Sequence, residues 1–520
     1  MSDNQTFIET LVFRERYRDE YWREHDPIAD DRLLWRAQTF RHTVHLVPGQ
    51  TILELGCGEL RLTRALLRVS RGENPITAVT FQSAAPLAPE FHGKIELLQI
   101  PKFPGDLMKR RFDYVVAMDL LDRANSSELL QIVHELLAPG GEMLFYESNP
   151  WNPFHKLRGL LSRLTGKRDQ RNLISRPCLY ELLSELGFVR IYAVFNDFVF
   201  APLTRGWIWF LRNLSILLEN APILRTMAGS ILIHAQKHPR QKQFRGLSLC
   251  EHESLRRAIS VVVPCHNEQM NIGPLTERIL LLYGDYIHEI IPVNDGSTDR
   301  TGDVIDELAA KDDRIKPLHR LPPNGVGLAI AEGLAAASGR YVLTMDCDFQ
   351  HLLPEFRDLL DAAAEGHDVV IGSRFSRHSV LLNYPFLKIL ANRAFHSLAV
   401  LLFGQRIRDV TNNLKIMRRE VVEDLQLRQP GFAVNAETGL QPIVLGYNVK
   451  QVPISWINRT PGMGVSSFRL AHVGGGYWYV LIGLWLRSAF GIGPYRALAR
   501  HDPVASVAPA EIATEIAAGR

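Results

Sequence analysis

Residues 341–351 read YVLTMDCDFQH, a short apolar run that ends in two carboxylates. A run of this length and composition predicts a buried strand of a parallel sheet. Asp346 and Asp348 stand two positions apart where this strand becomes a loop, so their carboxylates can converge. Hard oxygen ligands suit Mg²⁺ or Mn²⁺, and Gln350 is close enough in sequence to add a ligand. The apolar run before the acids argues against a merely solvated acidic loop.

Two upstream strands end in polar residues in the same way. Residues 259–263 (ISVVV) run into Pro264 and then Glu268, which a loop can present to a ribose or a base edge. The alternative is a helix start that Asn267 caps. A second strand ends in Asp295, at the carboxyl end where parallel sheets bind nucleotides. The alternative there is a common strand-to-helix turn.

A glycine pair, Gly325 and Gly327, precedes a helical stretch at residues 328–337. Backbone N–H groups at such a helix start suit a phosphate. The alternative is a tight turn that needs glycine for conformational reasons. Taken alone, the pair does not decide between the two.

These four motifs, in this order, resemble the family 2 glycosyltransferases, and most nearly the branch of the dolichol-phosphate mannose synthases and polyprenyl-phosphate glycosyltransferases. The sequence DCDFQH at residues 346–351 is similar to the DADLQH of that branch. The resemblance implies a GT-A fold and a nucleoside held by Pro264, Glu268 and Asp295. It also implies a metal–diphosphate site at Asp346 and Asp348. The implied reaction inverts the anomeric carbon and moves a sugar from a nucleotide-diphospho-sugar to a lipid phosphate, glycolipid or glycan.

Further matches extend the resemblance to residue 468. Gly372-Ser373-Arg374 resembles the family's GSR, and VPI at residues 452–454 leads to Arg459 as in the family, which implies that Arg374 and Arg459 contact the donor. Residues 412–415 (NNLK) replace the family's SGFR, and Ser467 replaces a frequent lysine. We therefore expect donor-phosphate or acceptor contacts that differ from those of the synthase branch.

Glu437 is the candidate general base or acceptor-positioning residue. A hydroxyl acceptor needs such a base, whereas a phosphate acceptor is already ionised near neutral pH. The alternative is an ordinary acidic residue at a helix start, where the helix dipole favours a negative charge.

Residues 52–59 (ILELGCGE) form a strand, an acid and a GxG turn in the first half. They resemble the class I S-adenosylmethionine-dependent methyltransferases, which implies a Rossmann-like fold with Glu54, Gly56 and Gly58 at the methionine end of S-adenosyl-L-methionine. The usual acid after the second strand is absent, so Thr80 or Gln82 has to replace it. The alternative is a degenerate Rossmann-like domain that binds or scaffolds without catalysis. His134 and His155 are candidate bases, although a lone histidine is more often structural.

The length of 520 residues favours two domains. We predict a methyltransferase-like domain at 1–237, a polar, mostly basic linker at 238–257 and a glycosyltransferase domain at 258–470. An amphipathic segment at 471–501 and a disordered Ala-rich tail at 502–520 follow.

The charge and the cysteines limit the class of protein. A formal net charge of +3 gives no argument for nucleic-acid binding. Five scattered cysteines and a charged N-terminus predict a cytoplasmic chain without disulfides or a signal peptide.

Three apolar stretches, at residues 207–210, 379–404 and 476–490, suit attachment to a membrane surface. We expect the protein to lie peripherally on the cytoplasmic face of the membrane, where a lipid acceptor would be reached. The alternative is that these stretches are core helices or contacts between domains.

Overall fold

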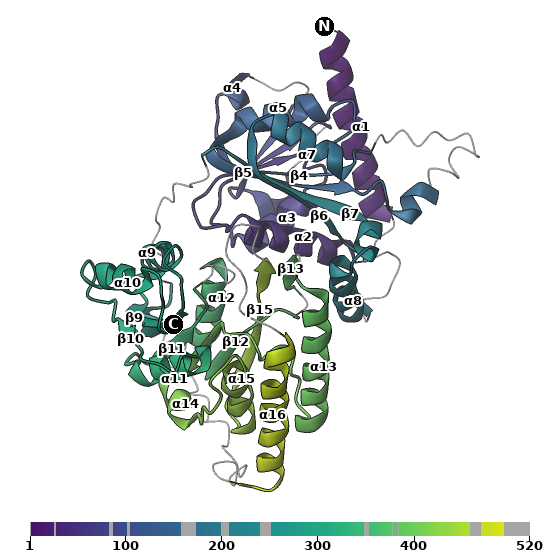
Figure 1. Cartoon of the computed structure of the whole chain (residues 1–520). Helices are drawn as coiled ribbons and strands as arrows, with labels where there is room; N and C mark the ends of the chain where they lie inside the picture. The colour runs from purple at the N-terminus through teal and green to yellow at the C-terminus, as the bar shows by residue number, and fades with distance from the viewer. Residues whose placement is uncertain are drawn as a thin grey trace, which may run out of the picture.

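The computed structural model describes residues 2–24, 28–82, 87–100, 105–157, 173–198, 207–239, 251–347, 353–376, 378–382, 384–457 and 470–492. These residues form two seven-stranded sheets, each with helices packed against it, and a small third sheet of two strands. Figure 1 shows the N-terminal sheet above the C-terminal one. Most of the expected linker and all of the expected tail lie outside the described residues.

The N-terminal sheet has the order β3-β2-β1-β4-β5-β7-β6. Its strands are β1 Ile52–Leu55, β2 Ile76–Thr80, β3 Ile95–Gln99, β4 Phe112–Met118, β5 Leu137–Ser148, β6 Phe188–Asn196 and β7 Ser230–Lys237. The first five strands are parallel, and β7 runs antiparallel to both of its neighbours. The strand order reverses between β1 and β4, which is the position where doubly wound sheets bind ligands.

Helices cover both faces of this sheet. They are α1 Ser2–Glu24, α2 Ala29–Thr43, α3 Arg61–Val69, α4 Gly105–Met108, α5 Ser126–Leu136 and α7 Arg176–Glu185, whereas α8 Ile208–Asn220 packs against β13 (Val380–Leu382) and α13 (Phe386–Phe403) of the other half. Alternate strand residues enter different apolar clusters: Leu53 lies in one and Ile52 in the other. A near-continuous apolar strand is therefore buried on both sides, as parallel sheets require.

The C-terminal sheet has the order β10-β9-β8-β11-β14-β12-β15. Its strands are β8 Ile259–Cys265, β9 Ile287–Asn294, β10 Leu318–His319, β11 Tyr341–Thr344, β12 Val369–Ser373, β14 Lys415–Arg418 and β15 Val449–Pro453. Strand β14 is antiparallel to β11 and β12, whereas β8 to β11 form a parallel block. The strands expected near residues 259, 289, 341 and 368 are all present.

The helices of this half are α9 Ile272–Tyr283, α10 Thr301–Ala309, α11 Val326–Ala336, α12 Leu353–Ala364, α13 Phe386–Phe403, α14 Arg419–Asp424, α15 Val434–Val444 and α16 Leu470–Ala489. Helices α13 and α16 lie side by side at the lower end of the molecule (Figure 1). The predicted amphipathic segment after residue 470 is thus helical over most of its described part.

The two halves share a junction made by the small sheet of β13 Val380–Leu382 and β16 Ser455–Ile457. Val380 and Leu382 are buried in an apolar cluster with Leu33 and Phe40 of α2. A strand of the C-terminal half therefore completes part of the N-terminal core.

Candidate functional site

The carboxyl ends of three neighbouring parallel strands bring the predicted motifs to one edge of the C-terminal sheet. The Asp295 N–H donates to the Cys265 carbonyl at 2.9 Å, and the Met345 N–H donates to the Val262 carbonyl at 3.2 Å. Pro264 near the end of β8 therefore lies at the same edge as Asp295 and Asp346, which follow β9 and β11. Sequence spacing could not show this directly, but parallel pairing demands it.

The first two motifs are cross-linked by hydrogen bonds between their loops. His266 Nδ1 lies 2.8 Å from the Asp295 carbonyl oxygen, and the Thr298 N–H donates to Asn267 Oδ1 at 2.8 Å. Asn267 has a φ of 57° and does not cap the next helix, whose N-cap is Asn271. The capping alternative for Asn267 is therefore wrong, because its side chain serves the neighbouring loop instead.

Glu268 is half-buried beside these loops. Asn271 Nδ2 donates to Glu268 Oε2 at 2.5 Å, and the Glu268 N–H donates to Thr301 Oγ1 at 2.8 Å. These contacts orient the carboxylate next to the Asp295 loop. A contact of Glu268 with a ribose or base remains a prediction.

Asp295 is buried and has two partners that sequence reasoning did not foresee together. Its carboxylate pairs with Arg320 and accepts the Gly325 N–H at 2.8 Å. Arg320 follows β10, whose pairing with β9 brings it to Asp295. The sequence motif around Asp295 does not indicate Arg320 as a partner, because the contact between the two residues depends on the pairing of β9 with β10.

The glycine pair packs against the backbone of residues 429–431. The Gly327 N–H donates to the Pro430 carbonyl at 2.9 Å, and a Cβ on Gly327 would lie 2.0 Å from the Gln429 carbonyl oxygen. The N–H groups of Gly325 and Gly327 thus both serve protein acceptors. The structure gives these glycines a close-packing role, and the contact of Gly325 and Gly327 with a donor phosphate stays a prediction.

Glu437 holds the same loop from the other side. Its Oε2 accepts the N–H groups of Arg428 at 2.9 Å and Gln429 at 3.0 Å. The side chain is buried, and burial raises the pKa of its carboxyl. It lies in the first turn of α15, as the helix-start alternative expected. These contacts give Glu437 a structural task, and none of them supports the general-base role.

Asp346 is half-buried at the end of β11. Its Oδ1 accepts a hydrogen bond from Asn413 Nδ2 at 2.8 Å, so the NNLK stretch that departs from the family pattern reaches the acidic motif. The carboxylate of Asp346 supplies hard oxygen ligands of the kind that fit Mg²⁺ or Mn²⁺, whereas Asn413 presents an N–H donor to it. Asp348, Gln350 and Arg459 lie outside the described residues.

Lys415 is fully buried close to this edge. Its Nζ donates to the Asn435 carbonyl at 2.8 Å and to Thr438 Oγ1 at 2.7 Å, which ties β14 to α15. Burial lowers the pKa of Lys415 to about 7. The lysine that replaces the family's arginine is therefore a structural link, with acceptors from the protein.

Arg374 forms a buried ion pair with Asp409. Its Nε lies 2.7 Å from Asp409 Oδ2 and its Nη2 lies 3.0 Å from Oδ1. Nη1 donates to the Tyr384 hydroxyl and Nη2 to Thr411 Oγ1, both at 3.1 Å. Burial alone would raise the pKa of Asp409, but the charge and hydrogen bonds of Arg374, together with the charges of His396 and Arg393, lower it. The Arg374 guanidinium, which we expected to contact the sugar donor, is therefore hydrogen-bonded to groups of the protein itself.

The first turn of the N-terminal sheet has the predicted strand, acid and GxG geometry. Gly56 and Gly58 have φ values of 67° and 49°, a region that favours glycine. Glu54 is buried and accepts from Thr63 Oγ1 at 2.6 Å, and burial raises its pKa to about 7. Glu54 therefore stabilises the start of α3, whereas a cofactor contact stays a prediction.

Side chains of α1 fill the cleft at the carboxyl ends of β1, β2 and β4. Glu15 accepts the N–H groups of Gly58 at 2.7 Å and Phe81 at 2.9 Å. Arg18 donates to the carbonyl oxygens of Gly56 and Met118. Glu15 and Arg18 are buried, so α1 satisfies the backbone groups that a ligand at this switch point would meet.

Asp19 completes this contact between α1 and the cleft. Gln82 Nε2 donates to Asp19 Oδ2 at 3.1 Å, and a Cβ on Gly58 would lie 2.1 Å from the same oxygen. Thr80 is buried, and its Oγ1 accepts the Gln82 N–H at 3.2 Å. The spacing of Glu15, Arg18 and Asp19 places them on one helical face, but their charges suggest solvent exposure, and sequence reasoning missed this contact.

Residues 260–426 match glycosyl transferase family 2. The chain is 32% identical over 214 residues to a polyprenol monophosphomannose synthase of Mycolicibacterium smegmatis, covering 40% of this chain and 80% of that protein. It is 31% identical over 204 residues to a dolichyl-phosphate hexose transferase of Haloferax volcanii, covering 39% and 83%. A solved glucosyl-3-phosphoglycerate synthase of Mycobacterium tuberculosis with uridine diphosphate covers 47% of this chain and 87% of its own, with 21% identity and a TM-score of 0.36.

The chain belongs to glycosyl transferase family 2. This membership, together with the sheet of β8 to β15, confirms the predicted α/β GT-A fold of the C-terminal half and its glycosyltransferase class. The N-terminal half is an α/β domain as expected.

Proposed function

We propose that the C-terminal half transfers a sugar from a nucleotide-diphospho-sugar to the phosphate of a polyprenyl-type lipid. The observation that carries this proposal is the family match together with Asp295 and Asp346 at one edge of the parallel strands. The names of the two relatives support a polyprenyl or dolichyl phosphate as acceptor. A glycolipid or glycan hydroxyl is the alternative acceptor.

Asp346 would hold Mg²⁺ or Mn²⁺, with Asp348 and Gln350 of the same motif as further ligands. A divalent cation at this point would neutralise the diphosphate that leaves. An acceptor phosphate oxygen attacks the anomeric carbon as the bond to the diphosphate breaks, so the configuration inverts and a nucleoside diphosphate departs. This acceptor requires no general base, which agrees with the engagement of Glu437 by the loop at residues 428–429.

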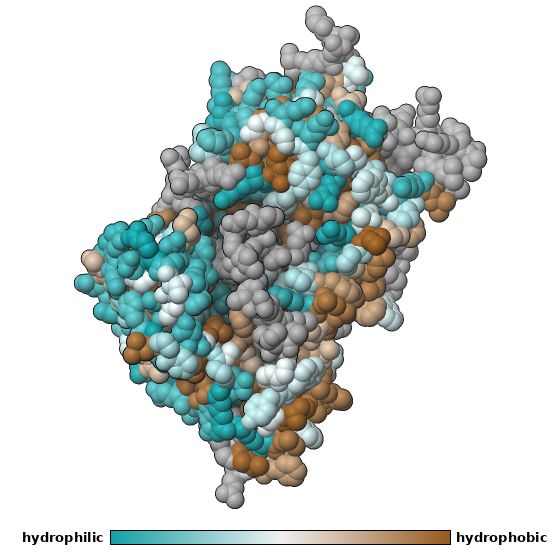
Figure 2. All heavy atoms as spheres, viewed as in Figure 1, coloured by the Kyte–Doolittle hydropathy of each residue, from teal (hydrophilic) through white to brown (hydrophobic). Residues whose placement is uncertain are grey.

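We further propose that the protein attaches peripherally to the cytoplasmic face of the membrane. The side chains of Leu387 and Leu401 on α13 are 67% and 78% exposed, and that of Tyr479 on α16 is 63% exposed. Figure 2 shows hydrophobic residues gathered on the side where α8 and α13 lie and near the lower end of α16. By length and composition, α13 could cross a membrane, with 22% of its residues buried. An apolar surface of this kind suits a lipid acceptor.

For the N-terminal half, we propose S-adenosyl-L-methionine as the ligand and methyl transfer to a related glycan as the activity. The switch point between β1 and β4 and the positive φ of Gly56 and Gly58 support this proposal. The contacts of α1 with the same cleft favour a second candidate, a non-catalytic scaffolding domain. Cofactor titration of the full chain separates the two candidates.

Sugar transfer is tested with the full chain, Mn²⁺ or Mg²⁺, a panel of UDP- and GDP-sugars, and a short polyprenyl phosphate. Released nucleotide and labelled lipid are followed together, with Asp346→Asn as the inactive control. A labelled lipid supports the proposal. Nucleotide release without a lipid product moves the acceptor to a hydroxyl-bearing glycan. A complete lack of donor turnover with every nucleotide-sugar contradicts the proposed activity.

A further inference from the structure

Helix α12 stands between the glycosyltransferase site and the N-terminal domain. It begins at Leu353, shortly after the acidic motif of residues 346–351. Glu355, Arg357, Asp358 and Asp361 on this helix contact the N-terminal domain or the segment at residues 251–252. The helix that follows the metal motif is thus held from outside its own domain.

The outer part of this contact is a network of ion pairs. Arg41 of α2 makes two bonds to Asp358, at 2.8 and 3.2 Å. Arg71 lies 2.7 Å from Asp358 and 2.5 Å from Asp361. Arg357 in turn pairs with Glu73 of the N-terminal domain. Each half therefore supplies arginines that pair with carboxylates of the other half.

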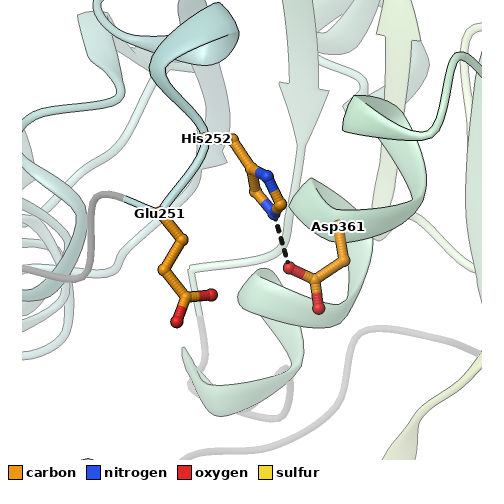
Figure 3. Close-up of side chains that lie close together, drawn as sticks. All are labelled: Glu251, His252 and Asp361. Atoms are coloured by element: carbon orange, nitrogen blue, oxygen red, sulfur yellow. Dashed lines mark hydrogen bonds and ion pairs between the residues drawn. The ribbon is translucent and has the colours of Figure 1, made fainter. Parts of the chain in front are cut away.

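Figure 3 shows Glu251, His252 and Asp361 close together at the edge of this network. His252 Nε2 lies 2.8 Å from Asp361 Oδ1, and Glu251 pairs with Arg357. Since arginines already neutralise both carboxylates, the cluster extends the ion-pair network, and these contacts give no support for a metal site.

The inner part of the contact is the pair of His42 and Glu355. His42 Nδ1 lies 3.0 Å from Glu355 Oε1, and both side chains are almost completely buried. Glu355 Oε1 also accepts the Ser455 N–H. Burial lowers the pKa of His42 and raises that of Glu355, because it disfavours the charged form of both groups. One carboxyl group thus joins α2, α12 and β16.

The two glycosyltransferase elements that Glu355 joins are next to two predicted donor-binding segments. Helix α12 follows the segment of Asp346, and β16 precedes that of Arg459 by two residues. Strand β16 also pairs with β13, whose Val380 and Leu382 are buried against α2. The same N-terminal helix therefore reaches both elements.

We propose that the N-terminal domain positions the glycosyltransferase site, with Arg41 and His42 of α2 as positioning residues that act through α12 and β16. The inference rests on the proposed glycosyl transfer but not on any methyl transfer. Under this proposal, the N-terminal domain contributes to sugar transfer even while the side chains of α1 fill its own cleft. A small displacement of a binding group costs large factors in rate, so the loss of these contacts should reduce transfer markedly.

The test compares the full chain with the double variant Arg41→Ala/Arg71→Ala. The matched control is Arg64→Ala, which removes an ion pair with Glu90 inside the N-terminal domain. Donor KM, kcat, the Mn²⁺ concentration at half-maximal rate and the affinity for Mn²⁺–nucleoside diphosphate are measured, together with the thermal unfolding midpoint. We expect kcat/KM to fall at least tenfold and the Mn²⁺ requirement to rise, while Arg64→Ala changes neither more than twofold.

The exchange variant Arg41→Asp/Asp358→Arg provides a rescue. We expect it to recover more activity than either single exchange, because the pair is restored in reverse. Transfer within twofold of wild type in the double variant overturns the inference, as does an equal loss in Arg64→Ala or a loss that only parallels a lower unfolding midpoint. If wild type does not turn over, the proposed function fails, and the nucleotide affinities still decide this inference.

Discussion

Helix α1 should act as an internal competitor for the N-terminal cleft, and Glu15→Ala tests this. Glu15 accepts two charge-assisted hydrogen bonds, at 2.7 and 2.9 Å. Such bonds contribute about 1.5–3 kcal/mol each. Burial of the carboxylate, which raises its pKa, offsets much of this sum. If Glu15→Ala destabilises the docked position of α1 by a net ~1.4 kcal/mol, the population of molecules in which α1 has left the cleft rises about tenfold. The affinity for S-adenosyl-L-methionine would rise by the same factor.

The assay is isothermal titration of the full chain with S-adenosyl-L-methionine, repeated with Glu9→Ala. Glu9 is an exposed glutamate on the same helix, so its loss should leave the affinity unchanged. Equal affinities for wild type and Glu15→Ala would refute the competition. Binding to none of the three proteins at millimolar ligand would refute the cofactor assignment and favour the scaffolding domain.

Four further predictions concern both halves of the chain. Asp346→Asn should reduce metal-dependent sugar transfer by at least about a hundredfold at an unchanged unfolding midpoint, because electrostatic stabilisation of the leaving charge is lost; retained turnover would remove Asp346 from the site. Asp409→Asn should lower the free energy of unfolding by about 3–5 kcal/mol in urea titrations, since Arg374 is left buried and unpaired; a loss below ~1 kcal/mol would contradict the account. Glu54 has a folded pKa of about 7, above its unfolded value, so its stabilising contribution is full below about pH 4.3 and is lost as pH rises through 7. Glu54→Gln should therefore flatten the dependence of the free energy of unfolding on pH over this range. An unchanged dependence would disprove the assignment. Leu387→Ser/Leu401→Ser should reduce sedimentation with anionic lipid vesicles severalfold, whereas Leu321→Ser, at a residue 84% exposed elsewhere, should not; equal losses would exclude α13 as the docking surface.

Much of the glycosyltransferase edge could be predicted from sequence. The runs ISVVV and YVLT are apolar enough to be buried on both faces, which identifies them as strands of a parallel sheet. Because parallel strands end at a common edge, the placement of Asp295 and Asp346 near one another follows from that assignment. The order of the motifs then indicated the family, which the comparisons confirm.

The partners of the candidate residues could not be predicted in this way. Arg374 and Glu437 both read as ligand-facing groups, but the structure pairs Arg374 with Asp409 and places Glu437 on the backbone of residues 428–429. A motif records which side chain is present and not which acceptors the folded chain brings to it. For the same reason, the NNLK departure could be noticed in sequence, while its contact with Asp346 could not.

The sequence by itself determined the strands, the edge where polar residues gather and the glycosyltransferase class, because these depend on local apolar patterning and short motifs. The tertiary structure alone decided that α1 fills the N-terminal cleft and that His42 reaches Glu355. Both are contacts between charged or titratable groups far apart in the chain. Such groups favour water unless the fold supplies a partner at hydrogen-bonding distance, and only the packed chain specifies that partner.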